Sequence, residues 1–307
     1  MSAPSVTEPS AAVDPGFAAK PRTHVLARTL GRAERLDPLA GKVAEKVQGI
    51  LTPGSVKDVL AGRWLGHALH PLLTDIPIGT WVSAVTLDLI GGRESERAAE
   101  KLIGAGLLAA APTAWSGLSE WSDSVPSSDE VRRVGLVHAA SNGTAAAFFG
   151  ASLIARKRGS QGTGKVLALA GAGALGFGGW LGSHMSYSLA VGVDQTALQE
   201  GATEWRPAIP AAELPEGVTR CVTVDGVSVL VVRQHGEVHA LANRCCHRGG
   251  PLHEGDLGEN TITCPWHAST FRLSDGSPIS GPAAYPQPIY DVRAGADGMM
   301  EVRARGK

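Results

Sequence analysis

Four long apolar segments occupy the middle of the chain, between a polar start and a mixed C-terminal third. They span about residues 72–90, 102–118, 134–155 and 166–191. Each approaches the ~20 residues that a helix needs to cross a bilayer. None shows the polar face that a helix of a water-soluble bundle presents to solvent. The pattern predicts a four-helix transmembrane α bundle over residues 66–193.

The residues before the bundle are more polar. Residues 1–35 are rich in Ser, Ala, Pro and charge, lack a secretory signal pattern, and are expected to form a disordered tail. Residues 36–65 carry apolar positions at helical spacing, with Asp37 as a helix N-cap, Pro38 in the first turn and a second short helix starting at Ser55. These amphipathic helices either lie on a membrane surface or pack against the bundle, and the pattern leaves both open.

Strand patterns dominate the chain after residue 193. Residues 194–204 are expected to act as a linker, and residues 205–307 to fold as a small all-β domain. Asp225-Gly226, between two apolar runs, indicates a hairpin turn. The expected strands are 218–224, 227–233, 238–243, 261–263, 270–272, 290–292 and 299–302. The predicted fold class is therefore multidomain, with the transmembrane α bundle followed by the all-β domain.

Charge and cysteine usage narrow the function. The formal net charge is −1, which gives no electrostatic reason to expect a nucleic-acid partner. Of the four cysteines, three lie within twenty residues of one another, at 245, 246 and 264. That spacing is unlike a disulfide framework and favours metal chemistry in a reducing compartment.

Two short segments of the β domain hold two cysteines and two histidines. Cys245-x-His247 is followed, after sixteen residues, by Cys264-x-x-His267. Two thiolates and two imidazoles suit a 2Fe–2S cluster in which one iron takes both Cys ligands and the other takes both His ligands. The spacing therefore predicts a cluster clamped between two tight loops.

Neighbouring residues suit such loops. Gly249 and Gly250 allow the first backbone turn to close near the cluster, and Pro265 stiffens the second loop. The rival interpretation is a Cys2His2 zinc site, which usually pairs two cysteines and then two histidines in a ββα unit. Here each half supplies one Cys and one His within a β-rich region, which favours the iron cluster.

Residues 205–302 resemble the Rieske ferredoxin family. The resemblance rests on the Cys-x-His and Cys-Pro-Trp-His segments and on Ser280-Gly281-Pro282-Ala283, which matches the family's proline-containing third loop. It implies a Rieske fold, with the two cysteines and two histidines as ligands and with Trp266, Ser269 and Pro282 beside the cluster. Rieske domains of ring-hydroxylating oxygenases are similar.

Two departures separate the chain from the high-potential Rieske proteins of quinol-oxidising complexes. Trp266 stands where those proteins have a cysteine that ties the two loops together, so Cys246 is expected to be a free thiol. Ser269 is present after the second histidine, but Phe271 replaces a Tyr that donates a hydrogen bond to the cluster. Loss of that donor predicts a potential near the low end of the Rieske range, about −150 mV.

A complete Rieske oxygenase is not expected. Such enzymes add a large C-terminal domain with a 2-His-1-carboxylate iron site. Forty residues follow His267, and none of them is a histidine. The enzyme class stays open, with an electron carrier as the first interpretation.

The apolar region resembles an uncharacterised family of bacterial four-helix membrane domains. The resemblance rests on Gly66-His67-Ala68-Leu69-His70-Pro71 and on Thr74-Asp75-Ile76-Pro77-Ile78-Gly79. It implies no activity, although fusion of such a domain to a Rieske domain looks like a recurring arrangement.

Several histidines are expected on the side of the bundle that carries the β domain. His70, His138 and His184 fall there when the four segments are threaded up and down. Polar residues at membrane depth are costly and often functional, so these histidines suit a haem b, a quinone or a metal ion. Asp75 is a candidate for orienting one of them. The alternative is that histidines near helix ends simply lie at the interface.

These observations favour a membrane-anchored, ferredoxin-like electron carrier. Its cluster histidines would lie at an exposed tip, taking electrons from a reductase and passing them to an unknown membrane or oxygenase acceptor. One alternative is a single-chain membrane redox enzyme whose bundle binds haem or quinone, and another is a redox sensor module. The expected location is the inner (cytoplasmic) membrane, crossed several times, with the Rieske domain on the cytoplasmic face.

Overall fold

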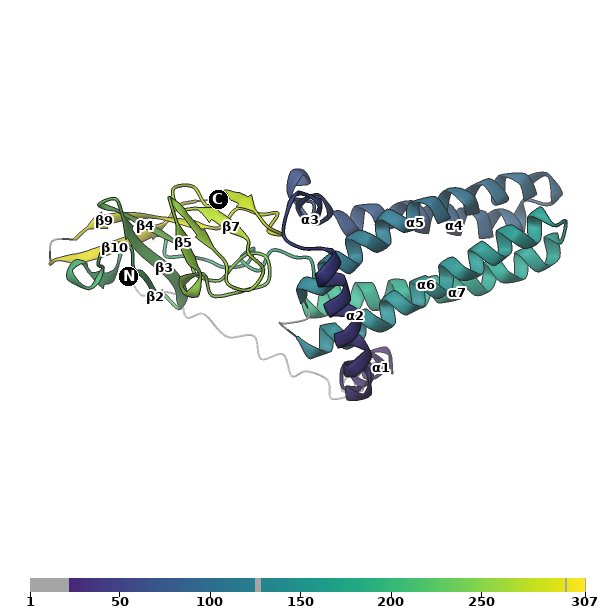
Figure 1. The fold of residues 1–307 in the computed structure, drawn as a ribbon, viewed down its shortest axis with the longest axis horizontal. Helices are drawn as coiled ribbons and strands as arrows, with labels where there is room; N and C mark the ends of the chain where they lie inside the picture. The colour runs from purple at the N-terminus through teal and green to yellow at the C-terminus, as the bar shows by residue number, and fades with distance from the viewer. Residues whose placement is uncertain (1–21, 125–127, 296, 307) are drawn as a thin grey trace, which may run out of the picture.

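The computed structural model describes residues 22–124, 128–295 and 297–306. A helical region at one end and a β domain at the other make the molecule elongated (Figure 1). Three short helices come first, namely α1 (Arg22–Gly31), α2 (Asp37–Ile50) and α3 (Ser55–Leu60). Four long antiparallel helices follow, namely α4 (Leu69–Ile90), α5 (Glu96–Ser124), α6 (Asp129–Lys157) and α7 (Gln161–Leu189). The predicted helical region followed by an all-β domain is confirmed.

Three of the described helical segments are long and apolar enough to cross a membrane. They are Leu69–Ile90, Arg93–Ser124 and Gln161–Leu189. The fourth long helix, α6, begins with the charged run Asp129-Glu130-Val131-Arg132-Arg133 and ends at Arg156-Lys157, which lowers its mean hydropathy.

The tail expected over residues 1–35 is only partly described. Residues 1–21 lie outside the described residues, whereas Arg22–Gly31 form α1, which corrects that part of the expectation. Leu30 of α1 packs into an apolar cluster with Val134. Arg133 also donates a hydrogen bond to the carbonyl of Gly31 at 2.9 Å. Docking on α6 therefore stabilises a helix that its composition alone does not predict.

Helix α2 forms over the expected residues, but Asp37 is not its N-cap. Leu36 occupies the N-cap position, and Asp37 lies inside the first turn. The Asp37 carboxylate accepts hydrogen bonds from Nε and Nη2 of Arg133 at 2.7 and 2.6 Å. These contacts hold the pKa of Asp37 well below its usual range. A long-range ion pair thus replaces the local cap.

Helix α2 packs against the bundle along one face only. Ala40 and Ala44 are buried against Trp121 of α5. Leu39 and Ile50, on the other face, remain 56% and 57% exposed. The packing interpretation therefore holds for one face of α2, which also buries Val47, whereas Leu39 and Ile50 are left uncovered.

The hairpin α4–α5 and the hairpin α6–α7 share one design. Three positions of α4 meet the positions 68 residues later in α6, across the middle of the bundle. The pairs are His70/His138, with ring centroids 6.4 Å apart, Trp81/Phe149, stacked at 4.5 Å, and Asp88/Arg156, an ion pair.

Glycines of the second helix in each hairpin repeat in the same way. A Cβ built on Gly106 would lie 2.3 Å from Nε1 of Trp81, and one built on Gly171 would lie 3.0 Å from the Phe149 ring. Gly171 follows Gly106 by 65 residues, and α7 begins 65 residues after α5. The helical region is therefore an internal two-fold repeat, with the large side chains of α4 and α6 packed on glycines of α5 and α7.

The β domain contains two antiparallel sheets. The larger has the order β1 (Arg206–Pro210), β10 (Met299–Ala304), β9 (Ile289–Ala294), β4 (Glu237–Ala242), β3 (Val227–Gln234) and β2 (Thr219–Val224). The smaller has the order β5 (Asp256–Gly258), β6 (Thr261–Thr263), β7 (Thr270–Arg272) and β8 (Pro278–Ser280). The seven expected strands are present within two residues at each end, and β1, β5 and β8 are additional.

The predicted turn at Asp225-Gly226 joins β2 and β3. Both residues have positive φ, +47° and +80°, as a two-residue type I′ hairpin requires. Beneath the smaller sheet, Cys245 and Cys264 are buried in a cluster with Leu230 and Phe271. This core anchors the two loops that carry the Cys and His motifs.

Candidate metal centre

The two motif loops have the same backbone hydrogen bonds. In the first loop, Cys245 N–H donates to the carbonyl of Gly250, and Gly249 N–H donates to the carbonyl of Cys245, both at 2.8 Å. In the second loop, Cys264 N–H donates to Ser269 at 2.8 Å, and Ala268 N–H donates to Cys264 at 3.1 Å. The fourth residue after each cysteine, Gly249 or Ala268, has a positive φ. Each cysteine therefore begins a tight loop that holds its side chain in one direction.

The loops bring the four predicted ligands together in two pairs. The Cys245 and Cys264 thiols are in hydrogen-bonding contact. The His247 and His267 rings lie with centroids 5.0 Å apart and planes at 88°. No three His, Cys, Asp or Glu side chains of the described residues converge as they would around one metal ion. Donors sorted into a sulfur pair and a nitrogen pair are the arrangement that two irons of different ligation require.

The histidines are prepared for metal binding. Nδ1 of His247 and both ring nitrogens of His267 are buried without a hydrogen-bond partner among the described residues. Burial, with the positive charges of Arg248 and Lys57, lowers the pKa of His267 to about 4 and holds the pKa of His247 well below its usual value. Both imidazoles are therefore neutral near pH 7, the form that binds metal.

The electrostatics of the two thiols also favour a metal centre. Contact with neighbouring sulfurs raises the pKa of Cys245 to about 12 and raises that of Cys264 as well, and burial adds to both effects. Two buried thiols in contact cannot both ionise without a nearby positive charge. A metal centre supplies that charge and deprotonates coordinating thiols, so the donor set fits an iron–sulfur cluster.

The predicted environment residues surround this pair of loops. A Cβ built on Gly250 would lie 2.8 Å from Sγ of Cys264 and 3.0 Å from Cγ of Trp266, so only glycine fits there. Trp266 is 45% exposed and covers Gly250 from outside, and Pro265 beside it is also exposed. Cys246 is buried, and its free thiol donates to the carbonyl of Tyr285 at 3.2 Å.

A third loop closes the site. Buried Ser269 accepts a hydrogen bond at its Oγ from the N–H of Ala283 at 3.0 Å, beside buried Pro282. Phe271 is fully buried in the core, where its ring offers no hydroxyl. Ser269 thus ties the third loop to the second one.

Gln287 is a supporting residue that the sequence analysis did not identify. Its side chain is 1% exposed and accepts a hydrogen bond from Cys246 N–H at 2.9 Å. Its Nε2 donates to the carbonyls of Ala242 and Arg244, both at 2.7 Å. Gln287, just before β9, therefore holds the first loop in place. Its role could not be predicted from the sequence, because it is a single Gln outside any motif.

The cluster end of the β domain is not the exposed tip that was expected. It rests on the helical region, where Arg248 lies 3.8 Å from Glu120 of α5. The carbonyl of Asp123 lies beside the His267 ring, at a geometry that leaves both ring nitrogens without a hydrogen bond. Both histidines are consequently only partly exposed.

Helix α3 completes this contact. Lys57 forms a buried ion pair with Asp123. Asp58 accepts a hydrogen bond from Gly281 N–H, in the third loop, at 3.1 Å. Arg63 donates to the carbonyl of Ile279. The amphipathic segment before the bundle is therefore the part that fastens the cluster loops to the helical region.

The predicted histidines of the helical region separate into two groups. His70 and His138 face each other across the two-fold repeat. His184 lies on α7 with its Nε2 buried and unpaired among the described residues, and it forms no ring contact or hydrogen bond there with the other two. Asp75 is exposed on α4 and orients neither ring, because backbone carbonyls of α5 and α7 do so instead.

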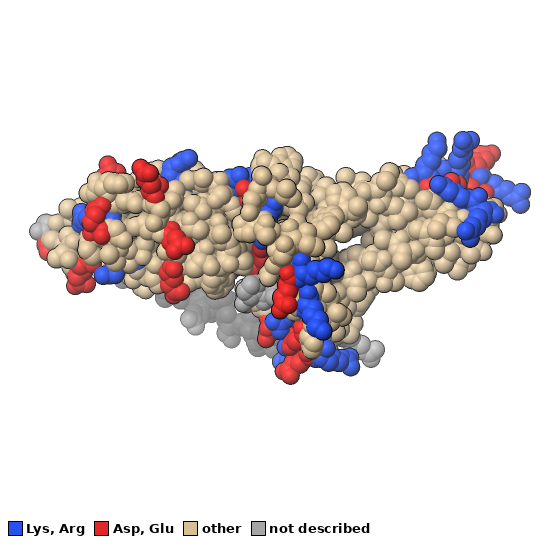
Figure 2. Space-filling model, in the orientation of Figure 1, with Lys and Arg blue, Asp and Glu red and all other residues tan. Residues whose placement is uncertain are grey.

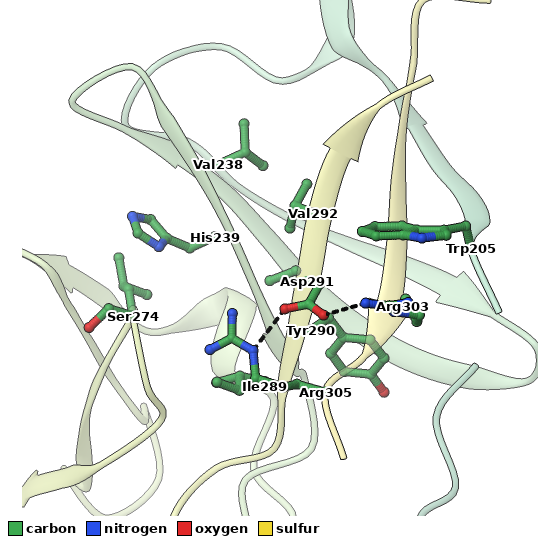
Figure 3. A pocket seen from close by; sticks show the side chains of 12 residues that line it. Trp205, Val238, His239, Ser274, Ile289, Tyr290, Asp291, Val292, Arg303 and Arg305 are labelled. Carbon is green, nitrogen blue, oxygen red and sulfur yellow. Dashed lines mark hydrogen bonds and ion pairs between the residues drawn. The ribbon is translucent and has the colours of Figure 1, made fainter. Parts of the chain in front are cut away.

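A pocket of about 390 Å³ opens in the β domain away from these loops (Figure 3). Asp291 accepts from Nη2 of Arg303 at 3.1 Å and from Nε of Arg305 at 2.8 Å. Trp205 stacks against Arg303, with 4.7 Å between the guanidinium carbon and the ring centroid. The charged side chains that line this pocket are thus already paired with one another, and we assign no ligand to the pocket.

Comparison with known proteins agrees with this geometry. Residues 204–291 match the family described as "Rieske [2Fe-2S] domain", and residues 66–195 match "Predicted membrane protein (DUF2231)". The ferredoxin component of the naphthalene 1,2-dioxygenase system of Pseudomonas aeruginosa is 30% identical over 90 residues, covering 29% of this chain and 86% of the relative. The chain therefore belongs to the Rieske [2Fe-2S] family through its C-terminal domain.

Two further matches cover the same domain. Human apoptosis-inducing factor 3 is 41% identical over 64 residues, which are 21% of this chain and 11% of that protein. The solved ferredoxin of carbazole 1,9a-dioxygenase from Nocardioides aromaticivorans IC177 is 29% identical, covering 33% of this chain and 98% of that one, with a TM-score of 0.31. The domain is ferredoxin-type, carries a 2Fe–2S cluster and transfers electrons, and it follows a predicted membrane domain.

Proposed function

We propose that the protein is a membrane-anchored Rieske electron carrier whose cluster is held by Cys245, Cys264, His247 and His267. The observation that carries the proposal is the sorting of these donors into a thiol pair and an imidazole pair, with three buried ring nitrogens that have no hydrogen-bond partner among the residues described. When bound, the cluster supplies one-electron chemistry. The chain keeps the imidazoles neutral, excludes water and orients all four donors.

The surface of the helical region supports the membrane anchor. Figure 2 shows charged side chains gathered at the far tip of the bundle, on the short helices and on the β domain, with an uncharged band between them. The tip carries Arg93, Arg97, Lys101, Lys157 and Lys165. A band of this kind suits hydrocarbon, with the charges at the two interfaces. We propose that α4–α7 all cross the bilayer, α6 through its apolar middle.

The short helices before the bundle also have exposed apolar side chains. Val56 and Val59 of α3 are 68% and 53% exposed, and Trp64 is 65% exposed. Exposed apolar residues with an aromatic at the end of a bundle suit the membrane interface. We propose that α2 and α3 lie there, each with one face on the protein and one in lipid.

The docked cluster end limits the choice of partners. Because the histidines face the protein's own helical region, we propose that electrons pass between a soluble reductase and the membrane domain or a membrane-bound acceptor. The ferredoxin component of the naphthalene 1,2-dioxygenase system is a relative, so an oxygenase acceptor is the second candidate.

We propose that the Rieske domain faces the cytoplasm, where flavin reductases supply electrons. Cys221 allows a direct test, because it is exposed on β2 whereas the other three cysteines are buried. A membrane-impermeant maleimide should label Cys221 only after cells are permeabilised, and Cys221→Ser should remove the label. Labelling of intact cells would place the domain outside.

The cluster assignment is tested by electron-spin-resonance spectra of membrane-extracted protein reduced with dithionite. Cys245→Ser and Cys264→Ser should each abolish the Rieske signal, because each substitution removes one of the two terminal thiolate ligands of one iron. Cys221→Ser is the matched control and should keep the full signal. A signal that survives either ligand substitution, or zinc in place of iron in the wild type, would overturn the assignment.

A further inference from the structure

The His70/His138 pair is the second place where two imidazoles face each other. His70 is the second residue of α4, His138 lies in the first third of α6, and the ring planes are 81° apart. Both side chains are largely buried within the bundle, at its end nearest the β domain. The electron-transfer role of the Rieske domain does not use them.

Each ring is held by a backbone carbonyl of its own hairpin. Nδ1 of His70 donates to the carbonyl of Thr113 at 3.0 Å, and Nδ1 of His138 donates to the carbonyl of Gly178 at 2.8 Å. A protonated Nδ1 leaves Nε2 as the lone-pair nitrogen, and this is the usual support of a metal-binding histidine. Asn142 lies 3.3 Å from both nitrogens of His138, so it is not directed at Nε2 alone.

The spacing of the rings suits one metal between them. Two metal–nitrogen bonds of about 2 Å in line, with the half-width of each ring added, separate the centroids by about 6 Å. The observed separation is 6.4 Å. No third His, Cys, Asp or Glu joins the pair among the described residues. A six-coordinate iron with two protein ligands in line can take its other four ligands from a macrocycle, as in haem.

Each ring packs closely on a glycine of its own hairpin. A Cβ built on Gly117 would lie 2.6 Å from Cε1 of His70, and one built on Gly182 would lie 3.0 Å from Cε1 of His138. Figure 2 shows an opening through the molecule between the two hairpins, in the half of the bundle nearest the β domain. This opening is the space in which a flat ligand between the hairpins would lie, with the polar side chains of Ser116 and Asn142 also beside the histidines.

We propose that His70 and His138 are the axial ligands of a haem b held between the two helical hairpins. The pair comes from equivalent positions of the internal repeat, so the haem lies on its two-fold axis. Gly117 and Asp123, which lies beside His267, are both on α5, about 9 Å apart along the helix axis at 1.5 Å per residue. The haem iron is then a one-electron partner for the cluster, Fe³⁺ becoming Fe²⁺ as the cluster loses one electron.

The test uses the full chain, expressed with 5-aminolaevulinate and extracted in detergent. We expect a Soret band, a reduced α band and about one haem b per chain by pyridine haemochrome. The near-perpendicular rings predict a strongly anisotropic low-spin ferric signal. His70→Ala and His138→Ala should each lose low-spin haem while keeping the Rieske signal, and exogenous imidazole should restore part of it.

His184→Ala is the matched control, because His184 is also a partly buried histidine of the same helical region. It should retain the haem. A full Rieske signal in wild-type protein without any haem band would overturn the haem site and leave the proposed carrier intact. Haem that survives both His70→Ala and His138→Ala, or is lost in His184→Ala alone, would also overturn it. Loss of the Rieske signal in the wild type would instead count against the proposed function.

Discussion

The two histidine pairs of this protein lie on opposite sides of its domain contact and are built differently. His247 and His267 stand on tight loops with two cysteines beside them, and Nδ1 of His247 and both ring nitrogens of His267 have no hydrogen-bond partner in the described part of the chain. His70 and His138 stand on helices without thiols, and each is tied by Nδ1 to a backbone carbonyl. The difference indicates that the loop pair relies on a cluster for its position, whereas the helix pair is already oriented by the fold.

Matched glycine substitutions give the largest expected effect on this comparison. Gly250→Ala should abolish the cluster signal, because its Cβ would lie 2.8 Å from Sγ of Cys264. Gly182→Ala should leave that signal unchanged and reduce bound haem, since its Cβ would lie 3.0 Å from the His138 ring. Metal analysis and optical spectra of both variants check this, and each variant is the other's control. Equal loss of the cluster and the haem in either variant would show that the two sites are not independent of each other.

The internal repeat predicts a smaller effect on stability. Asp88→Arg or Arg156→Asp alone should destabilise the helical region by about 3–5 kcal/mol, because each leaves a buried charge without a partner. The double variant reverses the pair at equivalent positions and should recover most of this loss. Recovery should be incomplete, because Ser152 also accepts from Nε of Arg156 at 3.1 Å.

Thermal unfolding of the detergent-extracted proteins, followed by far-ultraviolet circular dichroism, measures these changes. A double variant no more stable than the single variants would show that the two positions are not interchangeable. It would count against the two-fold design from which the haem site is inferred.

The smallest effect concerns the charges between the two regions. Lys57→Met should lower the cluster potential and Asp123→Asn should raise it, because the reduced cluster carries an extra negative charge. The expected size is tens of millivolts, about 59 mV for each ~1.4 kcal/mol. The double variant should lie between the two. Redox titration of the Rieske signal measures this, with Arg220→Gln on the exposed strand β2 as control. Equal potentials in all variants would mean that the charges of Lys57 and Asp123 do not affect the reduction potential of the cluster.

Local patterns predicted the β domain and identified the candidate ligands of its cluster. Cys245-x-His247 and Cys264-x-x-His267 each place two donors on one turn of chain, so spacing alone reveals them. Asp225-Gly226 predicted its hairpin for the same reason. The strands β5 and β8 were missed because Asp-Leu-Gly and Pro-Ile-Ser contain residues typical of turns, whereas the equally short β6 and β7 are rich in β-branched and aromatic residues.

Contacts between residues far apart in the sequence could not be predicted from local patterns. Asp37 looked like a helix cap, and only the fold brings Arg133 to it. The repeat was not predicted because several of its equivalent residues differ in type, as Trp81 and Phe149 do, although His70 and His138 match. The buried contact of Lys57 with Asp123 joins residues 66 positions apart, each ordinary in its local sequence.

The contacts of α3 with the cluster loops have a kinetic consequence. A carrier that diffuses freely meets its acceptor at a rate set by the concentration of both. Here the linker, the Arg248–Glu120 ion pair and the hydrogen bond from Gly281 N–H to Asp58 join the cluster domain to its own helical region. A tether of this kind replaces bulk concentration with an effective concentration in the millimolar range. Transfer within the chain should therefore be first order and unaffected by dilution, and only delivery by the reductase should slow in dilute membranes.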